Sequence, residues 1–151
     1  MNNFLELINI RNSFTSEKKI NVLRGISRKF RLGKTFAIMG PSGSGKSTLL
    51  NLISLIDKPT SGTIKLDNLE INFNQNEKND LIRAKKLGIV YQENNLLADF
   101  TALENVYFAS LSLNNDKKLA LSKAEKLLKK IGLSNRLNHF PSQLSGGEAQ
   151  R

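Results

Sequence analysis

Alternating apolar and polar positions dominate the first thirty residues of the chain. In FLELINIRNSF (residues 4–14) and INVLRGISRKF (residues 20–30), apolar side chains recur at about every second position. This period is typical of strands that bury one face. The polar stretch TSEKK (residues 15–19) separates the two. Together they predict an antiparallel hairpin.

Short apolar runs further along predict more strands. TFAIMG (residues 35–40) leads into a glycine-rich loop, and LGIVY (residues 87–91) follows a polar stretch. Continuous apolar runs of this length are typical of strands that are buried on both faces. A further strand is predicted at TIKL (residues 63–66). Helices are predicted from Lys46 to about Ile56, where Pro59 and its turn end the pattern, and over residues 77–86.

Helical periodicity takes over after Gln92. TALENVYFAS (residues 101–110) begins with a capping box, in which Thr101 accepts from a first-turn amide and Glu104 reaches back. A second helix is predicted between Asp116 and Ile131, with Gly132 at its end and an apolar face made by Leu121, Ala124, Leu128 and Ile131. The joint between the strand-rich and helical parts is expected at residues 92–100.

Composition narrows the classes of protein that fit this pattern. The 151 residues include no cysteine and one histidine, which excludes disulfides and thiolate metal sites. The longest apolar stretch, LLNLISLI (residues 49–56), is too short to span a membrane, and the N-terminus has no basic region typical of a signal peptide. The chain is therefore expected in the cytoplasm, and the absence of cysteine is compatible with a reducing compartment.

The formal charge of +10 raises the question of an acidic partner. Basic residues are spread through the chain, and the densest group lies on the polar side of the second predicted helix: Lys117, Lys118, Lys123, Lys126, Lys129 and Lys130. A solvated surface is the preferred interpretation, and binding to nucleic acid or to an acidic membrane surface is the alternative.

GPSGSGKST (residues 40–48) satisfies the pattern GxxxxGK(S/T) between a predicted strand and a predicted helix. Its glycines allow several amides to point into one concavity, where the positive end of the following helix also favours an anion. Lys46 is expected to lie along the β- and γ-phosphates of a nucleotide, and Ser47 to ligate Mg²⁺. The predicted nucleotide-binding residues here are Gly40, Pro41, Ser42, Gly43, Ser44, Gly45, Lys46, Ser47 and Thr48.

A second candidate phosphate site is LSGGE (residues 144–148). Ser145 and Glu148 form another capping box, and Gly146 and Gly147 leave the amides at the start of the helix open to an anion. A helix that is simply well capped is the alternative, but two glycines in its first turn would each destabilise it by up to ~1 kcal/mol.

With these motifs the sequence resembles the ATP-binding subunits of ABC transporters, whose signature LSGGQ is matched by LSGGE. The resemblance implies an α/β P-loop NTPase (ABC ATPase) fold with an N-terminal antiparallel β part, a partial RecA-like core and a helical subdomain. By this resemblance the chain is expected to be a partial ATP-binding domain that is truncated before the Walker B strand. Residues 1–92 would form its β-rich and P-loop core part, and residues 93–151 its helical subdomain with the signature motif.

The resemblance also assigns ATP and Mg²⁺ as cofactors and gives individual residues their roles. Gln92 corresponds to the Q-loop glutamine, which approaches Mg²⁺ and the attacking water. Phe14 stands where an aromatic ring stacks on adenine, although a hydrophobic residue closing the hairpin is an equal alternative. Ser145, Gly146 and Gly147 would contact ATP held by the P-loop of a second subunit in a sandwich dimer.

IDKPTSG (residues 56–62) and NNLLADFTALENV (residues 94–106) resemble the LolD/MacB/FtsE-like subgroup, and the latter wording is nearest to its lipoprotein-releasing members. This resemblance implies an ATPase that powers lipoprotein release from the bacterial inner membrane, peripheral on the cytoplasmic face. Its implied partners are a second ATPase subunit and transmembrane permease subunits of the LolC/LolE type, with no nucleic acid. Glu148, Asn94 and Ala98 depart from the usual residues.

Alternatives remain at this point. The chain is expected to be an N-terminal fragment that is inactive alone, because the Walker B carboxylates and the switch histidine of the family are not found in it. A soluble ABC ATPase associated with nucleic acid and a catalytically inactive remnant are the other two interpretations.

Overall fold

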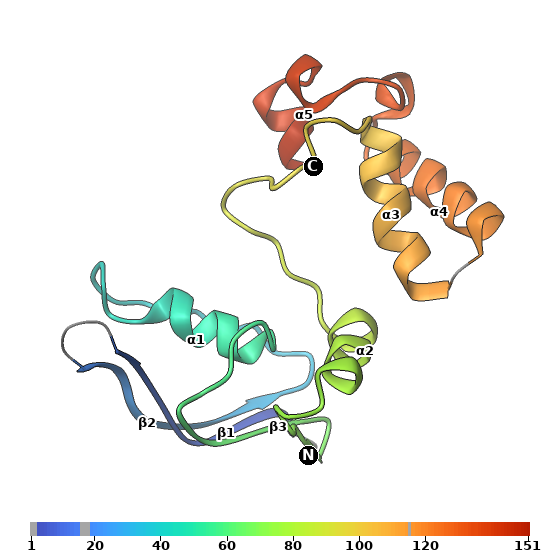
Figure 1. Ribbon diagram of the computed structural model, residues 1–151. Helices are drawn as coiled ribbons and strands as arrows, with labels where there is room; N and C mark the ends of the chain where they lie inside the picture. Colours follow the sequence, from blue (N-terminus) through green and yellow to red (C-terminus); the bar gives the residue numbers. More distant parts are fainter. Residues whose placement is uncertain (1–2, 16–18, 115) are drawn as a thin grey trace. The chain divides into compact units, whose positions relative to one another are not determined.

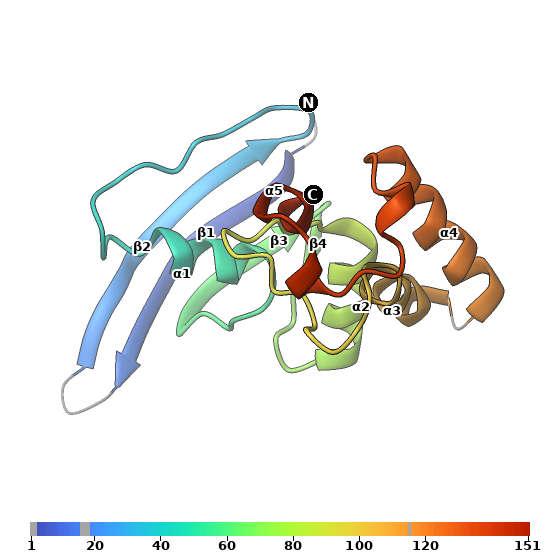
Figure 2. The same ribbon diagram turned by 90° about the horizontal axis from the view of Figure 1, so that it is seen from above.

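The computed structural model describes residues 3–15, 19–114 and 116–151. The chain forms two compact units, one ending at Gly88 and the other beginning at Ile89. The first unit contains all the strands of the described residues, and the second contains helices only. Figures 1 and 2 show the elements of each unit.

The N-terminal hairpin is confirmed. Strands β1 (Asn3–Thr15) and β2 (Lys19–Arg31) pair antiparallel, with several register shifts along their length. Of the turn predicted at residues 15–19, residues 16–18 lie outside the described residues. The sheet continues through β3 (Ser61–Leu66) and β4 (Leu69–Glu70) in the order β2-β1-β3-β4, with antiparallel pairing throughout. The strand predicted at residues 63–66 is therefore also confirmed.

Helix α1 (Lys46–Ile53) covers one face of this sheet, as Figure 2 shows. It begins at the predicted residue and ends earlier than expected, since Leu55 already has a left-handed backbone (φ +59°). Alternate residues of the strands meet this helix, which explains their period of two. The core of the unit consists of Leu5, Leu7, Ile10, Leu23, Leu49, Leu52, Leu55, Ile64, Leu66 and Ile71.

Helix α2 (Asn76–Lys86) confirms the second helix of this unit. Arg83 Nη1 donates to the carbonyl oxygen of Leu55 at 2.9 Å, which ties α2 to the segment after α1. The buried Asn79 side chain donates to the carbonyl of Asn72 at 2.9 Å, so its amide is satisfied inside the unit.

The strands predicted at residues 35–40 and 87–91 are wrong, since neither segment has regular secondary structure. A strand needs ladder hydrogen bonds to a neighbour, and in the described part of the chain neither segment joins the sheet. Apolar side chains are left uncovered as a result, with Met39 87% and Val90 92% exposed. Phe36 is held by an edge-to-face contact with Phe30, their ring centroids 4.9 Å apart.

In the second unit, α3 (Ala102–Asn114) and α4 (Lys117–Lys130) pack together as a helical pair. They are followed by two 3₁₀ turns, η1 (Ser134–Arg136) and η2 (Pro141–Gln143), and by α5 (Gly146–Gln150). The first was predicted from its capping box and the second from periodicity. Of the apolar face predicted for α4, Ala124 and Leu128 are buried, whereas Leu121 and Ile131 are exposed and Ala120 is buried.

Side chains cap the starts of both helices, and the capping box at Thr101 is the one that the sequence predicts. The Thr101 hydroxyl accepts from the Glu104 amide at 3.3 Å, and Glu104 accepts in return from the Thr101 amide at 2.8 Å. Asp116 accepts from the Leu119 amide at 3.0 Å. Within the residues that the structure describes, no helix has both the length and the apolar character to cross a bilayer.

Candidate functional site

At the start of α1, glycine stands at the position where a capping side chain would be. Gly45 has a left-handed backbone (φ +89°), and among the described residues no side chain caps α1. A Cβ at this position would lie 2.9 Å from side-chain carbons of both Val22 and Leu23, so β2 leaves room only for glycine. The first-turn amides of α1 are therefore left to a ligand or to solvent.

Lys46 places its ammonium over the loop that precedes the helix. Its Nζ donates to the carbonyl oxygens of Gly40 at 2.9 Å and Pro41 at 2.8 Å. The Ser44 amide donates to the same Pro41 oxygen at 3.3 Å and closes the loop into a turn. The structure therefore brings an ammonium and an uncapped helix start together at one loop.

The remaining residues of this loop are open to an incoming phosphate. Ser42, Gly43, Ser44 and Ser47 are exposed, and Thr48 is half-buried one turn into α1. Amides, an ammonium and hydroxyls are the groups that bind polyphosphates, and a serine hydroxyl is a hard oxygen ligand suited to Mg²⁺. The donor set of the loop thus fits a nucleotide with its metal ion.

The second predicted phosphate site, at the start of α5, is organised by Glu148. The carboxylate accepts from the Ser145 amide at 2.9 Å, and the Ser145 hydroxyl accepts from the Glu148 amide at 3.2 Å, which confirms the predicted capping box. Arg136 Nε donates to the other carboxylate oxygen at 3.0 Å. A Cβ on Gly146 or Gly147 would meet nothing within 4 Å of the described residues. Space within this unit therefore does not explain the two glycines.

Acid is expected to loosen this capping box. The hydrogen bond from the Ser145 amide, together with that from Arg136, lowers the pKa of Glu148 to about 2. A carboxyl whose folded pKa is depressed stabilises the fold fully above its unfolded pKa and loses that contribution as the pH falls through its folded pKa. We expect the Ser145 amide resonance to titrate with a midpoint near pH 2. A midpoint at the ordinary glutamate value would show that the capping box does not form.

Gln92, Phe14 and Ser47 lie on different parts of the chain. Gln92 is exposed in the second unit, and the strand expected to precede it is not formed. Phe14 is 52% exposed near the end of β1, opposite Ile20. Ser47 belongs to the first unit, so a joint role of Ser47 and Gln92 at Mg²⁺ stays a prediction.

Two residues that the sequence analysis did not single out, Asn105 and Arg136, stabilise local structure in the second unit through side-chain hydrogen bonds. Asn105 connects α3 to the segment before it: its Nδ2 donates to three carbonyls between residues 97 and 101, and its Oδ1 accepts from the Leu97 amide at 2.8 Å. Arg136 fixes Glu148. An asparagine inside a helical pattern disfavours the helix unless its side chain bonds to backbone, and this was the available signal for Asn105. Arg136 had none, because its partner is twelve residues away.

Comparison with known proteins bears on the same regions. A sequence profile of the ABC transporter family matches residues 23–151. The chain is 47% identical over 134 residues to the lipoprotein-releasing system ATP-binding protein LolD of Saccharophagus degradans, covering 89% of this chain and 59% of that protein. It is 46% identical over 137 residues to LolD of Wigglesworthia glossinidia brevipalpis, covering 91% and 60%. The chain thus spans about three-fifths of the length of these curated relatives.

Solved structures agree with the sequence relatives. The dimeric structure of MJ0796, described as a bacterial ABC transporter cassette, matches with a TM-score of 0.85 and 36% identity, covering 96% of this chain and 65% of that one. A second structure of the same cassette, bound to ADP and Pi in a post-hydrolysis state, matches equally well. The expected α/β ABC ATPase fold is therefore confirmed. The chain belongs to the ABC transporter family.

Proposed function

We propose that this chain binds ATP through the loop at residues 40–48 as part of an ABC transporter ATPase. The observation that carries the proposal is the start of α1, where Gly45 leaves the helix uncapped and Lys46 holds its ammonium over the loop. A polyphosphate would receive the first-turn amides and the ammonium together. The MJ0796 cassette bound to ADP and Pi supports the same assignment by its similarity.

Other predicted residues extend this proposal around the nucleotide. Ser47, with Gln92, would hold Mg²⁺, and Phe14 offers an exposed ring for adenine. When bound, Mg²⁺ would neutralise charge on the phosphate oxygens. Ser145, Gly146 and Gly147 would contact the nucleotide of a second subunit. The dimeric MJ0796 cassette and the otherwise unexplained pair of glycines support this last assignment.

The wider role that we propose is to power lipoprotein release from the bacterial inner membrane, from a peripheral position on its cytoplasmic face. The names of the relatives support this role, since both are lipoprotein-releasing system ATP-binding proteins. The proposed partners are a second ATP-binding subunit and permease subunits of the LolC/LolE type. The family match favours this role over a nucleic-acid-associated ATPase.

Calorimetric titration tests the binding proposal. Mg-ATP added to the chain is expected to give saturable heat, and omission of Mg²⁺ is expected to weaken binding. Because most of the proposed contacts are to phosphates, adenosine should bind far more weakly at the same concentration. Absence of heat with Mg-ATP up to millimolar concentration, from protein with a cooperative thermal melt, would contradict the proposal.

A further inference from the structure

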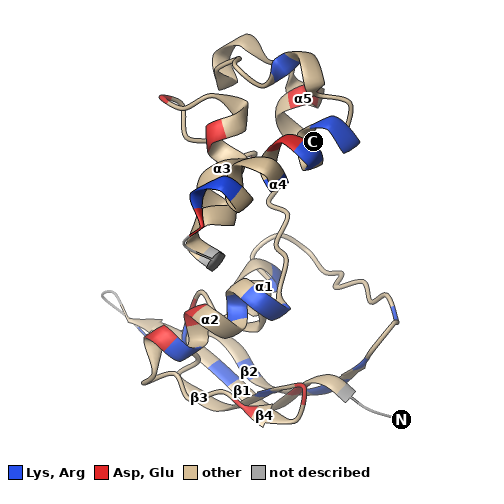
Figure 3. Cartoon of the chain, turned by 90° about the vertical axis from the view of Figure 1, so that its right-hand side faces the viewer, with Lys and Arg blue, Asp and Glu red and all other residues tan. Residues whose placement is uncertain are grey.

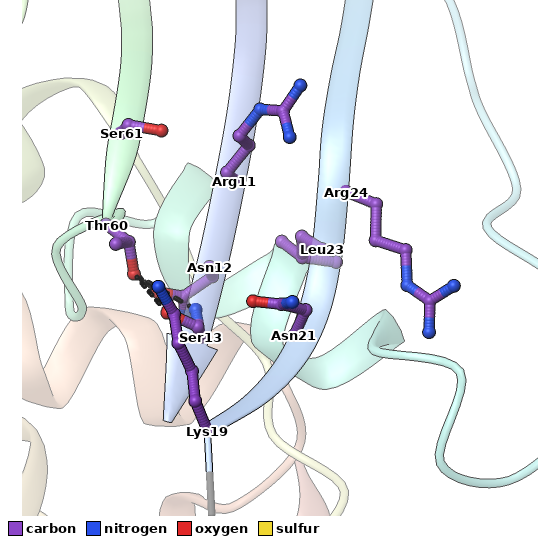
Figure 4. A pocket seen from close by; sticks show the side chains of 9 residues that line it. All are labelled: Arg11, Asn12, Ser13, Lys19, Asn21, Leu23, Arg24, Thr60 and Ser61. Carbon is purple, nitrogen blue, oxygen red and sulfur yellow. Dashed lines mark hydrogen bonds between the residues drawn. The ribbon is translucent and has the colours of Figure 1, made fainter. Parts of the chain in front are cut away.

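A second concave surface lies in the first unit, at the junction of three strands. It is a cavity of about 480 Å³, within the size range of small-molecule sites. Figure 4 shows the 9 side chains that line it. None of the nucleotide-site residues predicted from the sequence is among them, and the described lining contains no carboxylate.

Three cations line this cavity. Arg11 of β1 and Arg24 of β2 stand directly opposite one another in the strand register, and Lys19 begins β2 nearby. Directly opposed side chains of an antiparallel pair share one face of the sheet, where like charges destabilise the pairing. The Arg11 guanidinium extends over β2, since its Nη2 would lie 3.4 Å from a Cβ built on Gly25. The register therefore places the two arginines opposite one another on β1 and β2, and Figure 4 shows their side chains extending in different directions from there.

Some charges of the same sheet are paired. Five residues before Arg11 on β1, Glu6 is paired in register with both Lys29 and Lys65, and Lys29 Nζ lies 2.8 Å from a Glu6 carboxylate oxygen. Lys65 also lies 4.0 Å from Glu70 on β4. Figure 3 shows basic segments in blue on β1 and β2. The cavity shares its excess of positive charge with the surface lined by Arg28, Lys29, Arg31 and Lys34, and differs from it in taking its lining from three strands.

Hydroxyl groups make up another part of the cavity wall. The Thr60 hydroxyl donates to Asn12 Oδ1 at 3.2 Å and accepts from the Ser13 amide at 3.0 Å. The Ser13 and Thr60 hydroxyl oxygens are 3.4 Å apart, and Figure 4 shows this cluster with its hydrogen bonds. Ser61, which pairs in register with Arg11, adds another hydroxyl on the β3 side. The Thr60 hydroxyl proton is already donated to Asn12, so Ser13 and Ser61 supply the hydroxyls that could donate to the oxygens of a phosphate.

We propose that this cavity binds a phosphate-bearing small anion, with Arg11, Arg24 and Lys19 as its cationic ligands. A bound anion would offset the positive charge of the lining, because guanidinium and ammonium groups donate charge-assisted hydrogen bonds to phosphate oxygens. The size of the cavity accommodates more than one phosphate group. The site does not depend on nucleotide binding at residues 40–48, and its ligand would be a second one for this chain.

Pyrophosphate is a suitable probe, and the Lys46→Ala chain separates this cavity from the loop at residues 40–48. We expect saturable calorimetric binding of pyrophosphate to Lys46→Ala in a buffer without other multivalent anions. Adding Arg24→Thr is expected to weaken it at least tenfold, and Arg11→Gln should do the same. Lys29→Thr is the matched control, since it removes one charge from the same strand outside the cavity, and it should change the affinity less than twofold.

Thermal melting gives a second measurement on the same chains. Removing one of two opposed like charges is expected to raise the melting temperature of Lys46→Ala by about 1–3 °C without anion. Pyrophosphate should stabilise Lys46→Ala but not its Arg24→Thr version, because only binding to the folded state raises stability. A lower melting temperature for Arg24→Thr without anion would contradict the excess of positive charge on which the proposal rests.

Three other outcomes would overturn the proposal. The first is the absence of pyrophosphate binding to Lys46→Ala. The second is an equal loss of affinity in the Arg24→Thr and Lys29→Thr chains, which would show that overall charge and not the cavity attracts the anion. The third is tighter, Arg24-dependent binding of a single-stranded oligonucleotide than of pyrophosphate, which would make the surface a nucleic-acid site.

Discussion

Replacement of Lys46 by alanine is expected to weaken Mg-ATP binding by about 100-fold. Hydrogen bonds to charged groups contribute about 1.5–3 kcal/mol each, and a loss of ~2.7 kcal/mol corresponds to a 100-fold change in dissociation constant. Lys46 is the residue whose ammonium lies over the loop, bonded to the carbonyls of Gly40 and Pro41. The measurement is calorimetric titration of the two chains with Mg-ATP under identical conditions.

Lys34→Ala provides the matched control for this prediction, because it also removes one lysine charge from the exposed segment before the loop. Its affinity for Mg-ATP should remain within twofold of the original chain. Equal weakening by Lys34→Ala and Lys46→Ala would mean that net charge, and not the position of one ammonium, determines binding. Melting curves without nucleotide would show whether each chain is folded.

The second large effect is expected for Gly62→Ala, at the close approach of β3 to β1. Gly62 has φ +101°, and a Cβ there would lie 2.5 Å from the Asn9 carbonyl oxygen and 2.7 Å from that of Ile8. Both atoms are backbone, so no side chain can rotate out of the way. We expect the free energy of unfolding to fall by about 2–4 kcal/mol, measured by urea denaturation.

Gly33→Ala separates the clash from the backbone strain. Gly33 also has a left-handed backbone (φ +71°), but a Cβ there would meet no described residue within 4 Å. Its substitution should cost only the conformational part, about 1 kcal/mol. If both substitutions lower the stability equally, the close approach of the two strands is not what requires glycine at residue 62.

Local patterns predicted the local elements of this chain well. The period of two gave the hairpin, and capping residues such as Thr101 and Ser145 marked helix starts that the structure confirms. The apolar runs at residues 35–40 and 87–91 were predicted as strands and are not. An apolar run shows only that a segment needs covering, whereas a strand also needs a neighbour to pair with, which composition does not specify.

For the candidate sites, the sequence indicated residues but not their contacts. The GxxxxGK(S/T) pattern identified the loop, yet it could not show that Val22 and Leu23 of a distant strand leave no room for a Cβ at Gly45. The opposed arginines of the cavity were equally hidden. The hairpin has register shifts on both sides of Arg11, and they decide which residue of β2 lies opposite Arg11. A shift by one residue would place the side chains of β2 on the other face of the sheet.

The bonds that Lys46 makes in the absence of ligand affect which nucleotides the loop would favour. Its ammonium already has two carbonyl acceptors, so capture of a phosphate exchanges existing bonds and does not simply add new ones. A nucleoside monophosphate lacks the β- and γ-phosphates along which Lys46 is expected to lie, so it would leave these bonds in place and gain only the amides. Along the series AMP, ADP, ATP, the largest increase in affinity is therefore expected at the first added phosphate that replaces the Gly40 and Pro41 carbonyls as acceptor of the Lys46 ammonium.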